Sequence, residues 1–146
     1  MANRSPKTRC SGEWTEARYK SFIISALRSK SSRWKPKQQC ISEARVERGI
    51  YKCDLCGAIG GATLPPLKGK DKRRKNIIAD HITPVIDPTV GFVDWNTFID
   101  RLFCERDGFQ AVCWECHTSK TKEERDIATE RKRKEKTLLR AETDEN

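Results

Sequence analysis

The chain has 146 residues, enough for one domain or for one small domain with extensions. Only 36% of the residues are hydrophobic and 35% are charged, so the core is small, and small cores usually need a staple such as a metal. The net charge of +9 favours a polyanion partner such as nucleic acid over simple solubility, and no apolar run approaches the roughly 18 residues that a membrane span needs.

The first third of the chain predicts two helices. Thr15 is suited to cap a helix that begins at Glu16 and gathers its apolar residues on one broad side. A second, shorter helix is expected over residues 36 to about 48, with Gly49 as its end. Residues 1–49 are therefore interpreted as an N-terminal helical extension. The cations clustered near the break between the helices fit either a phosphate contact or an ordinary solvated turn.

The next segment combines a metal-binding motif with a basic loop. Cys53 and Cys56 form a Cys-x-x-Cys pair followed by a glycine, which is typical of a zinc knuckle. Residues 68–75 carry six cations and one acid, so they belong on the surface. We favour a phosphate-contacting loop over a merely solvated hairpin tip. Its candidate contacts are Lys70, Lys72, Arg73, Arg74 and Lys75.

The second half predicts a strand followed by two helices. Residues 76–83 are the best strand candidate, and strict alternation along it places Asp80 and His81 on opposite faces. Asp94 is suited to cap a helix over residues 95 to about 103. A short apolar segment then leads to a second Cys-x-x-Cys pair, and residues 114–136 form a helix-permissive, charged segment whose distal part is expected to be helical only in part.

The cysteines indicate metal ligation rather than disulfide bonds. The chain has seven, an odd number, and it lacks the apolar core of a secretory signal, so we expect a reducing cytoplasm. Two pairs with two-residue spacing provide four thiolates for one tetrahedral zinc ion, and such a closed site is structural. The predicted zinc ligands are Cys53, Cys56, Cys113 and Cys116. The other three, Cys10, Cys40 and Cys104, match no ligand spacing.

The two histidines of the chain suggest hydrolytic chemistry. Hydrolysis of a phosphodiester needs a base for water, a hard cation that offsets charge, and ligands that leave sites on that cation open. His81 suits the base because an imidazole titrates near neutral pH. Asp80 suits a divalent cation, and His117, just after the second cysteine pair, suits its second ligand. A single histidine is more often structural, but both lie at positions that the zinc ion would bring together.

These residues resemble the HNH (His-Asn-His, ββα-metal) endonuclease family, in its phage and bacterial branch with two zinc-binding Cys-x-x-Cys pairs. The resemblance covers roughly residues 50–123 and includes both cysteine pairs, Asp80-His81 with Pro84, Trp95 to Cys104, and Gln110 to Thr121. It implies an α+β fold in which a ββα core, stapled by a four-cysteine zinc site, carries an N-terminal helical extension and a basic C-terminal helix or tail over residues 124–146. It also implies DNA cleavage that depends on Mg²⁺ or Mn²⁺, with Asp80 and His117 as ligands and His81 as general base.

One position departs from the family pattern. The family's middle residue, usually Asn, comes five positions before the third cysteine, and Gly108 stands there. The resemblance gives that Asn a bracing role toward the base histidine. Asp107 or Asn96 is suited to replace it; otherwise the bracing is lost and activity is weakened.

Two functional hypotheses follow. The first is a metal-dependent endonuclease, encoded by a phage, that acts on double-stranded DNA in the host cytoplasm, with Lys120 as a phosphate contact or a solvated helix lysine. The alternative is a non-catalytic, zinc-stapled DNA-binding accessory or regulatory protein. It explains the charge and the cysteines equally well but not Asp80-His81 with His117. No sustained heptad specifies a dimer.

Overall fold

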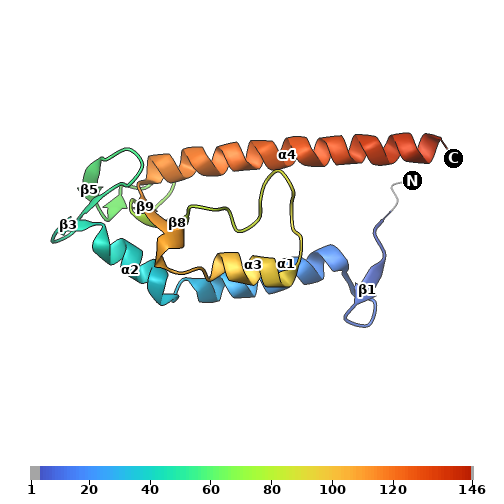
Figure 1. Ribbon diagram of the computed structural model, residues 1–146, viewed down its shortest axis with the longest axis horizontal. Coiled ribbons are helices and arrows are strands. Elements are labelled where there is room, and N and C mark those ends of the chain that lie inside the picture. Colours follow the sequence, from blue (N-terminus) through green and yellow to red (C-terminus); the bar gives the residue numbers. More distant parts are fainter. Residues whose placement is uncertain (1–3, 146) are drawn as a thin grey trace. The chain divides into compact units, whose positions relative to one another are not determined.

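The computed structural model describes residues 4–145, which divide after Trp34 into two compact units. The described residues form four α-helices and several short antiparallel pairs of strands, so the fold belongs to the α+β class (Figure 1). The prediction of that class is confirmed. The second unit begins at Lys35, so α2 belongs to it, although the sequence suggested placing that segment in the N-terminal extension.

The first unit is a hairpin followed by one helix. Strand β1 (Lys7–Arg9) pairs antiparallel with β2 (Trp14–Thr15), which leads directly into α1 (Glu16–Ser31). The Thr15 side chain accepts a hydrogen bond from the Arg18 amide at 3.2 Å, so the predicted helix cap is confirmed. Arg9 forms an ion pair with Glu16 at 2.7 Å and ties the hairpin to the first turn of α1.

The second unit opens with a shorter helix than the sequence predicted. Helix α2 (Lys35–Glu43) ends five residues early, because the following residues form β3 (Arg45–Glu47), which pairs with β4 (Ile50–Lys52). Gly49, expected to end the helix, instead adopts a φ of +75° in the turn between these strands, a conformation that favours glycine. Strand β4 also pairs with β5 (Ile59–Gly61), and the turn between them carries the first cysteine pair.

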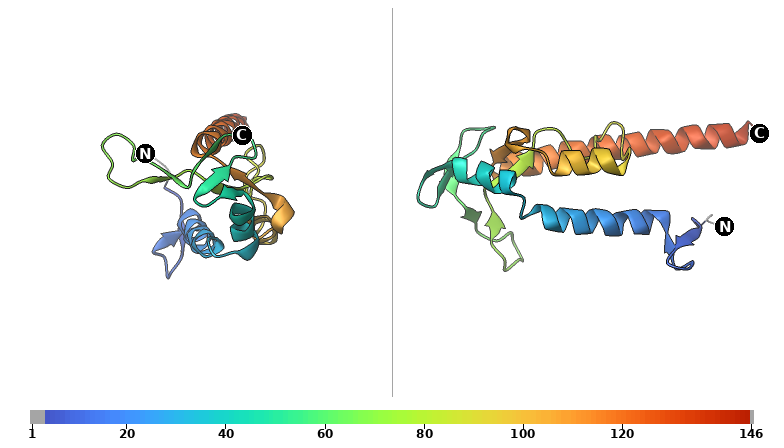
Figure 2. Two further views of the ribbon diagram at one scale, coloured as in Figure 1. Left: turned by 90° about the vertical axis from the view of Figure 1, so that its left-hand side faces the viewer. Right: turned by 60° about the horizontal axis from the view of Figure 1, so that its bottom comes forward.

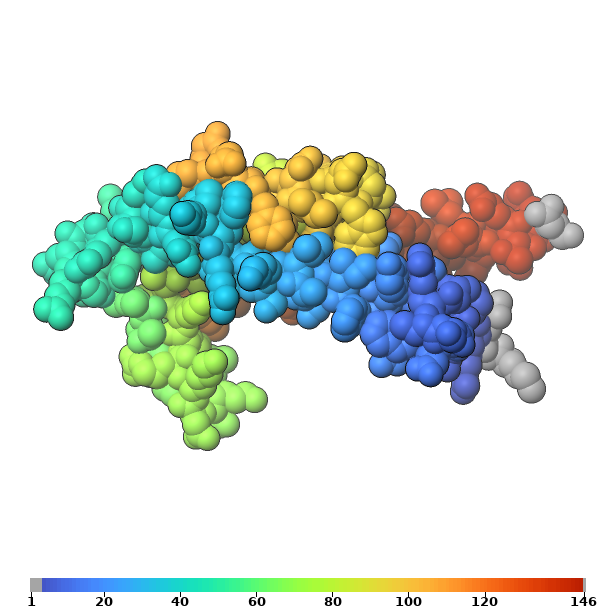
Figure 3. Space-filling model, turned by 90° about the horizontal axis from the view of Figure 1, so that it is seen from below, coloured from blue at the N-terminus to red at the C-terminus, as the bar shows by residue number. Residues whose placement is uncertain are grey.

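An arm formed by β6 (Thr63–Leu64), β7 (Arg74–Lys75) and the loop between them follows. The arm projects from the other elements of the second unit, as the light green segment in Figures 2 and 3 shows. It contains the whole basic loop of residues 68–75. The prediction of a surface loop is therefore confirmed.

The centre of the second unit is a two-stranded antiparallel sheet. Strand β8 (Ile78–His81) pairs with β9 (Phe109–Val112), so that Asp80 lies opposite Gln110 and His81 opposite Phe109. Helix α3 (Trp95–Leu102) and a 3₁₀ turn, η1 (Arg106–Gly108), lie between the two strands in the chain, and Asp94 caps α3 as predicted. The buried apolar side chains of this unit are Cys40, Cys53, Ile77, Ala79, Val85, Phe98, Leu102, Phe109, Ala111 and Val112.

The last element, α4 (Trp114–Asp144), begins two residues after β9 and is longer than the sequence predicted. Its first turns lie beside β8, whereas its distal half extends past the other elements of the second unit (Figure 2). Ion pairs one turn apart on its surface, such as Lys134 with Glu130 and Arg131 with Glu135, support the extended part. The order strand, strand, helix thus places the end of β8, all of β9 and the start of α4 in one neighbourhood.

Candidate functional site

The four predicted zinc ligands come together. Cys53 and Cys56 lie in the turn between β4 and β5, and Cys113 and Cys116 lie at the start of α4; their sulfur atoms are all within 4.8 Å of one another. Cys56 and Cys113 are 3.8 Å apart. A tetrahedral zinc ion with bonds of about 2.3 Å has sulfur–sulfur edges of about 3.8 Å. The cluster therefore fits a four-thiolate zinc site, and the remaining cysteines lie elsewhere.

The knuckle is attached to the central sheet through a residue that the sequence analysis did not identify. Asp54 lies between the first two cysteines; its amide donates to the Ala111 carbonyl and its carboxylate accepts from the Ala111 amide, both at 2.7 Å. These two bonds join the knuckle to β9. No local signal marks this role, because its partner lies 57 residues away.

Within the cluster, the pKa of one thiol lies below the ordinary thiol value and the pKa values of two others lie above it. Burial raises the pKa of Cys53, but hydrogen bonds from the amides of Cys56, Cys113 and Leu55 outweigh it and lower the value to about 6. A side-chain hydrogen bond with Cys113, together with burial, raises the pKa of Cys116 to about 12, and burial raises the pKa of Cys113. Several thiolates this close repel one another, so the cluster favours a bound cation.

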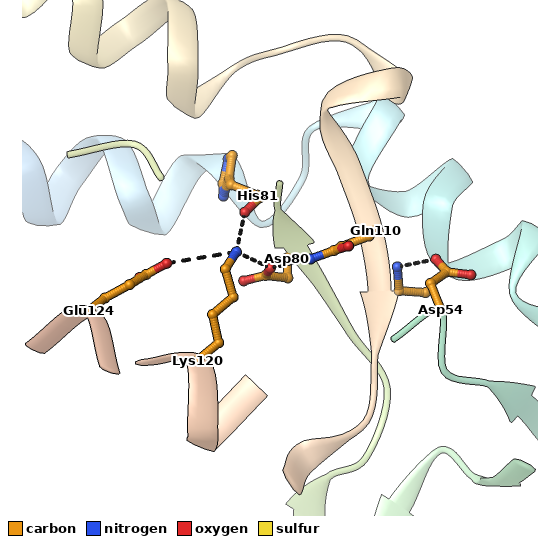
Figure 4. A network of polar contacts seen from close by, with 7 residues as sticks. Asp54, Asp80, His81, Gln110, Lys120 and Glu124 are labelled. Carbon is orange, nitrogen blue, oxygen red and sulfur yellow. Dashed lines mark hydrogen bonds and ion pairs between the residues drawn. The ribbon is translucent and has the colours of Figure 1, made fainter. Parts of the chain in front are cut away.

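Asp80 lies at the centre of a polar network that involves α4 (Figure 4). Its Oδ2 atom accepts hydrogen bonds from Gln110 Nε2 at 3.0 Å and from Lys120 Nζ at 2.5 Å. The same ammonium group donates to the His81 carbonyl oxygen at 2.6 Å and lies 3.7 Å from Glu124 Oε1. Two carboxylates and one carbonyl thus surround a positive charge. Hard oxygen donors of this kind are those that Mg²⁺ and Mn²⁺ prefer, and here they surround the Lys120 ammonium group.

The His81 imidazole lies on the other side of the strand from the Asp80 carboxylate, as alternation predicts. Its Nε2 atom is 3.0 Å from the Leu102 carbonyl oxygen, and its ring packs against Phe109 with centroids 4.7 Å apart. A carbonyl oxygen only accepts hydrogen bonds, so this contact favours the tautomer with the proton on Nε2.

His117 is separate from the Asp80 network. It lies one residue after Cys116 on α4, half-buried, and its side chain forms no hydrogen bond or ion pair within residues 4–145. It lines a hollow of about 350 Å³ together with Thr118, Thr121, Lys122 and Arg125. The role of His117 as a metal ligand stays a prediction.

Neither residue suggested as a substitute for the family's Asn is hydrogen-bonded to His81. Within the described part of the chain, Asp107 and Asn96 form no hydrogen bond with His81, and both are exposed. Backbone carbonyls hold this segment instead: Gly108 accepts from the Ile82 amide at 3.0 Å, and Leu102 contacts the imidazole. A Cβ atom at Gly108 would lie 2.5 Å from the Cys104 sulfur, so the side chain of Cys104 fills the space that an Asn would need.

The cationic side chains of the arm that were predicted to contact phosphate differ in their surroundings. Arg74 donates to the Pro65 carbonyl and stacks over Trp114 at 4.3 Å, and Arg73 donates to the Thr63 hydroxyl. Lys70, Lys72 and Lys75 are exposed. The two arginines therefore shape the arm, and the three lysines present charge to solvent.

Comparisons with known proteins assign no family to this arrangement. No family model matches the chain, and neither the curated proteins nor the solved structures contain a match. Within residues 4–145, no helix combines the length and the apolar character that would let it cross a membrane.

Proposed function

We propose that this chain is a metal-dependent endonuclease of the HNH type that hydrolyses phosphodiester bonds in DNA. The supporting observation is the path of the chain: β8 ends at Asp80 and His81, pairs with β9, and β9 leads through the cysteine cluster into α4 with His117 and Lys120. This is the strand–strand–helix order that the resemblance implies.

His81 is the proposed base. The imidazole, which contacts the Leu102 carbonyl through Nε2, takes a proton from water while the water oxygen attacks phosphorus. The bond between phosphorus and the 3′ oxygen breaks, and the leaving oxygen takes a proton from solvent. Phe109 and Leu102 hold the imidazole in place throughout.

Asp80 and His117 are the proposed ligands of Mg²⁺ or Mn²⁺, with zinc as a purely structural ion. When bound, the divalent cation supplies positive charge that stabilises the leaving oxygen. The Lys120 ammonium group forms an ion pair with Asp80 and neutralises its charge. That ion pair, together with Gly108, is the best support for the alternative, a non-catalytic zinc-stapled DNA-binding protein.

The test is nicking of supercoiled plasmid with Mg²⁺, with Mn²⁺ or with neither, by the wild type and by His81→Ala. We expect cleavage only with a divalent cation, and its loss in His81→Ala while DNA retardation on a gel persists. His81→Gln is a second variant, because its amide can still donate to Leu102 but cannot act as a base near neutral pH. A wild type that binds DNA but leaves it intact in either metal would contradict the proposal.

A further inference from the structure

The charges of α4 are sorted onto two sides of the helix. Successive residues of an α-helix are turned by about 100° around its axis. Within residues 118–143, the positions that fall on one side of α4, in an arc of roughly 100°, are threonines, Leu139 and five cations. We call these cations the α4 stripe: Lys122, Arg125, Lys132, Lys136 and Arg140. No carboxylate of that stretch falls inside the arc. Such segregation exceeds what solubility requires, because alternating charges would serve solubility equally well.

Ion pairing follows the same division. The cations of α4 outside the arc are all paired: Lys120 with Asp80, Arg131 with Glu135, and both Arg133 and Lys134 with Glu130. The five members of the α4 stripe are exposed and form no ion pair within the described residues. Their charge is therefore available to an external anion, whereas that of the other four is neutralised within the helix and its neighbours.

The position of the α4 stripe indicates what kind of anion it fits. Lys122 and Arg125 line the same hollow as His117, so the stripe begins beside the candidate site. From Lys122 to Arg140 it extends for about 27 Å at 1.5 Å per residue. That length corresponds to about eight base pairs, so a phosphate backbone that enters the hollow can follow the helix.

We propose that the α4 stripe binds the phosphate backbone of a nucleic acid that runs from the His117 hollow along the distal half of α4. This rests on the proposed function for its starting point, but the binding itself needs no hydrolysis. Thr129, on the same arc between Arg125 and Lys132, adds a hydroxyl group that can donate to a phosphate oxygen. The surface carries no base-reading pattern, so it binds without sequence preference.

A relocation variant tests the α4 stripe at constant composition. Exchanging Lys136 with Thr137 and Arg140 with Ala141 (K136T/T137K/R140A/A141R) moves two charges off the arc and keeps the net charge of +9. A matched control, Lys136→Arg with Arg140→Lys, keeps both charges in place. All proteins carry His81→Ala, so that a DNA duplex of about 30 base pairs stays intact without a chelator that would strip zinc.

Affinity is measured by fluorescence anisotropy between about 50 and 200 mM salt. Each phosphate contact adds about 0.9 to the slope of log affinity against log salt, so the relocation variant should lose about 1.8 from the slope. Over that range the affinity of the unrelocated protein then falls about tenfold more than that of the relocation variant. The control should match the unrelocated protein, and far-UV circular dichroism should show equal helix content.

Equal slopes of log affinity against log salt for the relocation variant and the control would overturn the proposal for the α4 stripe. It would also be overturned if neutralising the arm lysines abolished DNA binding while relocating the stripe charges left it unchanged. A relocation variant that loses binding to vesicles of anionic lipid, but not to DNA, would also overturn it. A different result would contradict the proposed function. If the wild type never cleaves DNA but binds it with the expected salt dependence, the nuclease proposal is wrong and the α4 stripe proposal stands. If a relocation variant with His81 restored cleaves and binds DNA like the wild type, only the α4 stripe proposal is wrong.

Discussion

At the scale of single residues, Lys120 governs how Asp80 meets a cation. Its ammonium group lies 2.5 Å from the carboxylate, and the two side chains are only 23% and 13% exposed. A divalent cation at Asp80 has to displace this group or share the carboxylate with it. The lysine that the sequence suggested as a phosphate contact would thus compete with the proposed cation for Asp80.

Lys120→Met should therefore tighten Mn²⁺ binding by about tenfold, or about 1.4 kcal/mol, because it removes a competing positive charge and keeps the apolar stem. Calorimetric titration with Mn²⁺ on the zinc-loaded protein measures the effect. Lys122→Met removes an exposed charge from the same helix and serves as the control. Weaker Mn²⁺ binding by Lys120→Met would mean that the lysine supports the ion rather than competes with it.

At the scale of elements, the connection from α3 to β9 replaces the bracing expected from the family pattern. The 3₁₀ turn η1 brings Gly108 against Cys104, and its carbonyl extends the pairing beyond β8 to Ile82. An Asn side chain at position 108 would meet the Cys104 sulfur. Restoring the family residue alone is therefore unfavourable.

Gly108→Asn should lower the free energy of unfolding by about 1–3 kcal/mol, the usual cost of overpacking. In a Cys104→Ala background, where the sulfur is gone, the same change should cost clearly less. Urea denaturation of the four proteins gives this double-mutant cycle. Identical costs in both backgrounds would show that Cys104 does not oppose the Asn.

At the scale of the whole molecule, the cysteine cluster joins two segments of the second unit that are far apart in the chain. It fixes the knuckle between β4 and β5 to the first turn of α4, and nine other buried apolar side chains form the remaining core. A core of this size would leave a metal ion bound by the cluster, such as zinc, a large share of the stability.

Removal of zinc should abolish cooperative unfolding of residues 35–146, and rebinding should depend on pH. The raised pKa values of Cys113 and Cys116 keep both protonated at pH 7, so zinc displaces at least two protons and its affinity falls as the pH falls. The expected loss is about 100-fold or more per pH unit near neutrality. Proton release into a weakly buffered indicator solution checks this; release of fewer than two protons per zinc ion would contradict it.

The sequence alone determined the features that arise from neighbouring residues. The caps of α1 and α3 were predictable because Thr15 and Asp94 bond to amides three residues away. The four clustered cysteines were predictable because two-residue spacing directs both sulfurs of a pair to one ion. The exposed basic loop followed from charges that no core can bury.

Only the tertiary structure decided the contacts between distant segments. Lys120 meets Asp80 across 40 residues, Asp54 meets Ala111 across 57, and the His81 ring meets Leu102 across 21. Residues 45–47 became a strand rather than the end of α2 because a pairing partner in β4 lies beside them. Such choices depend on the free energy of packing and pairing in three dimensions, which no local pattern of residues encodes.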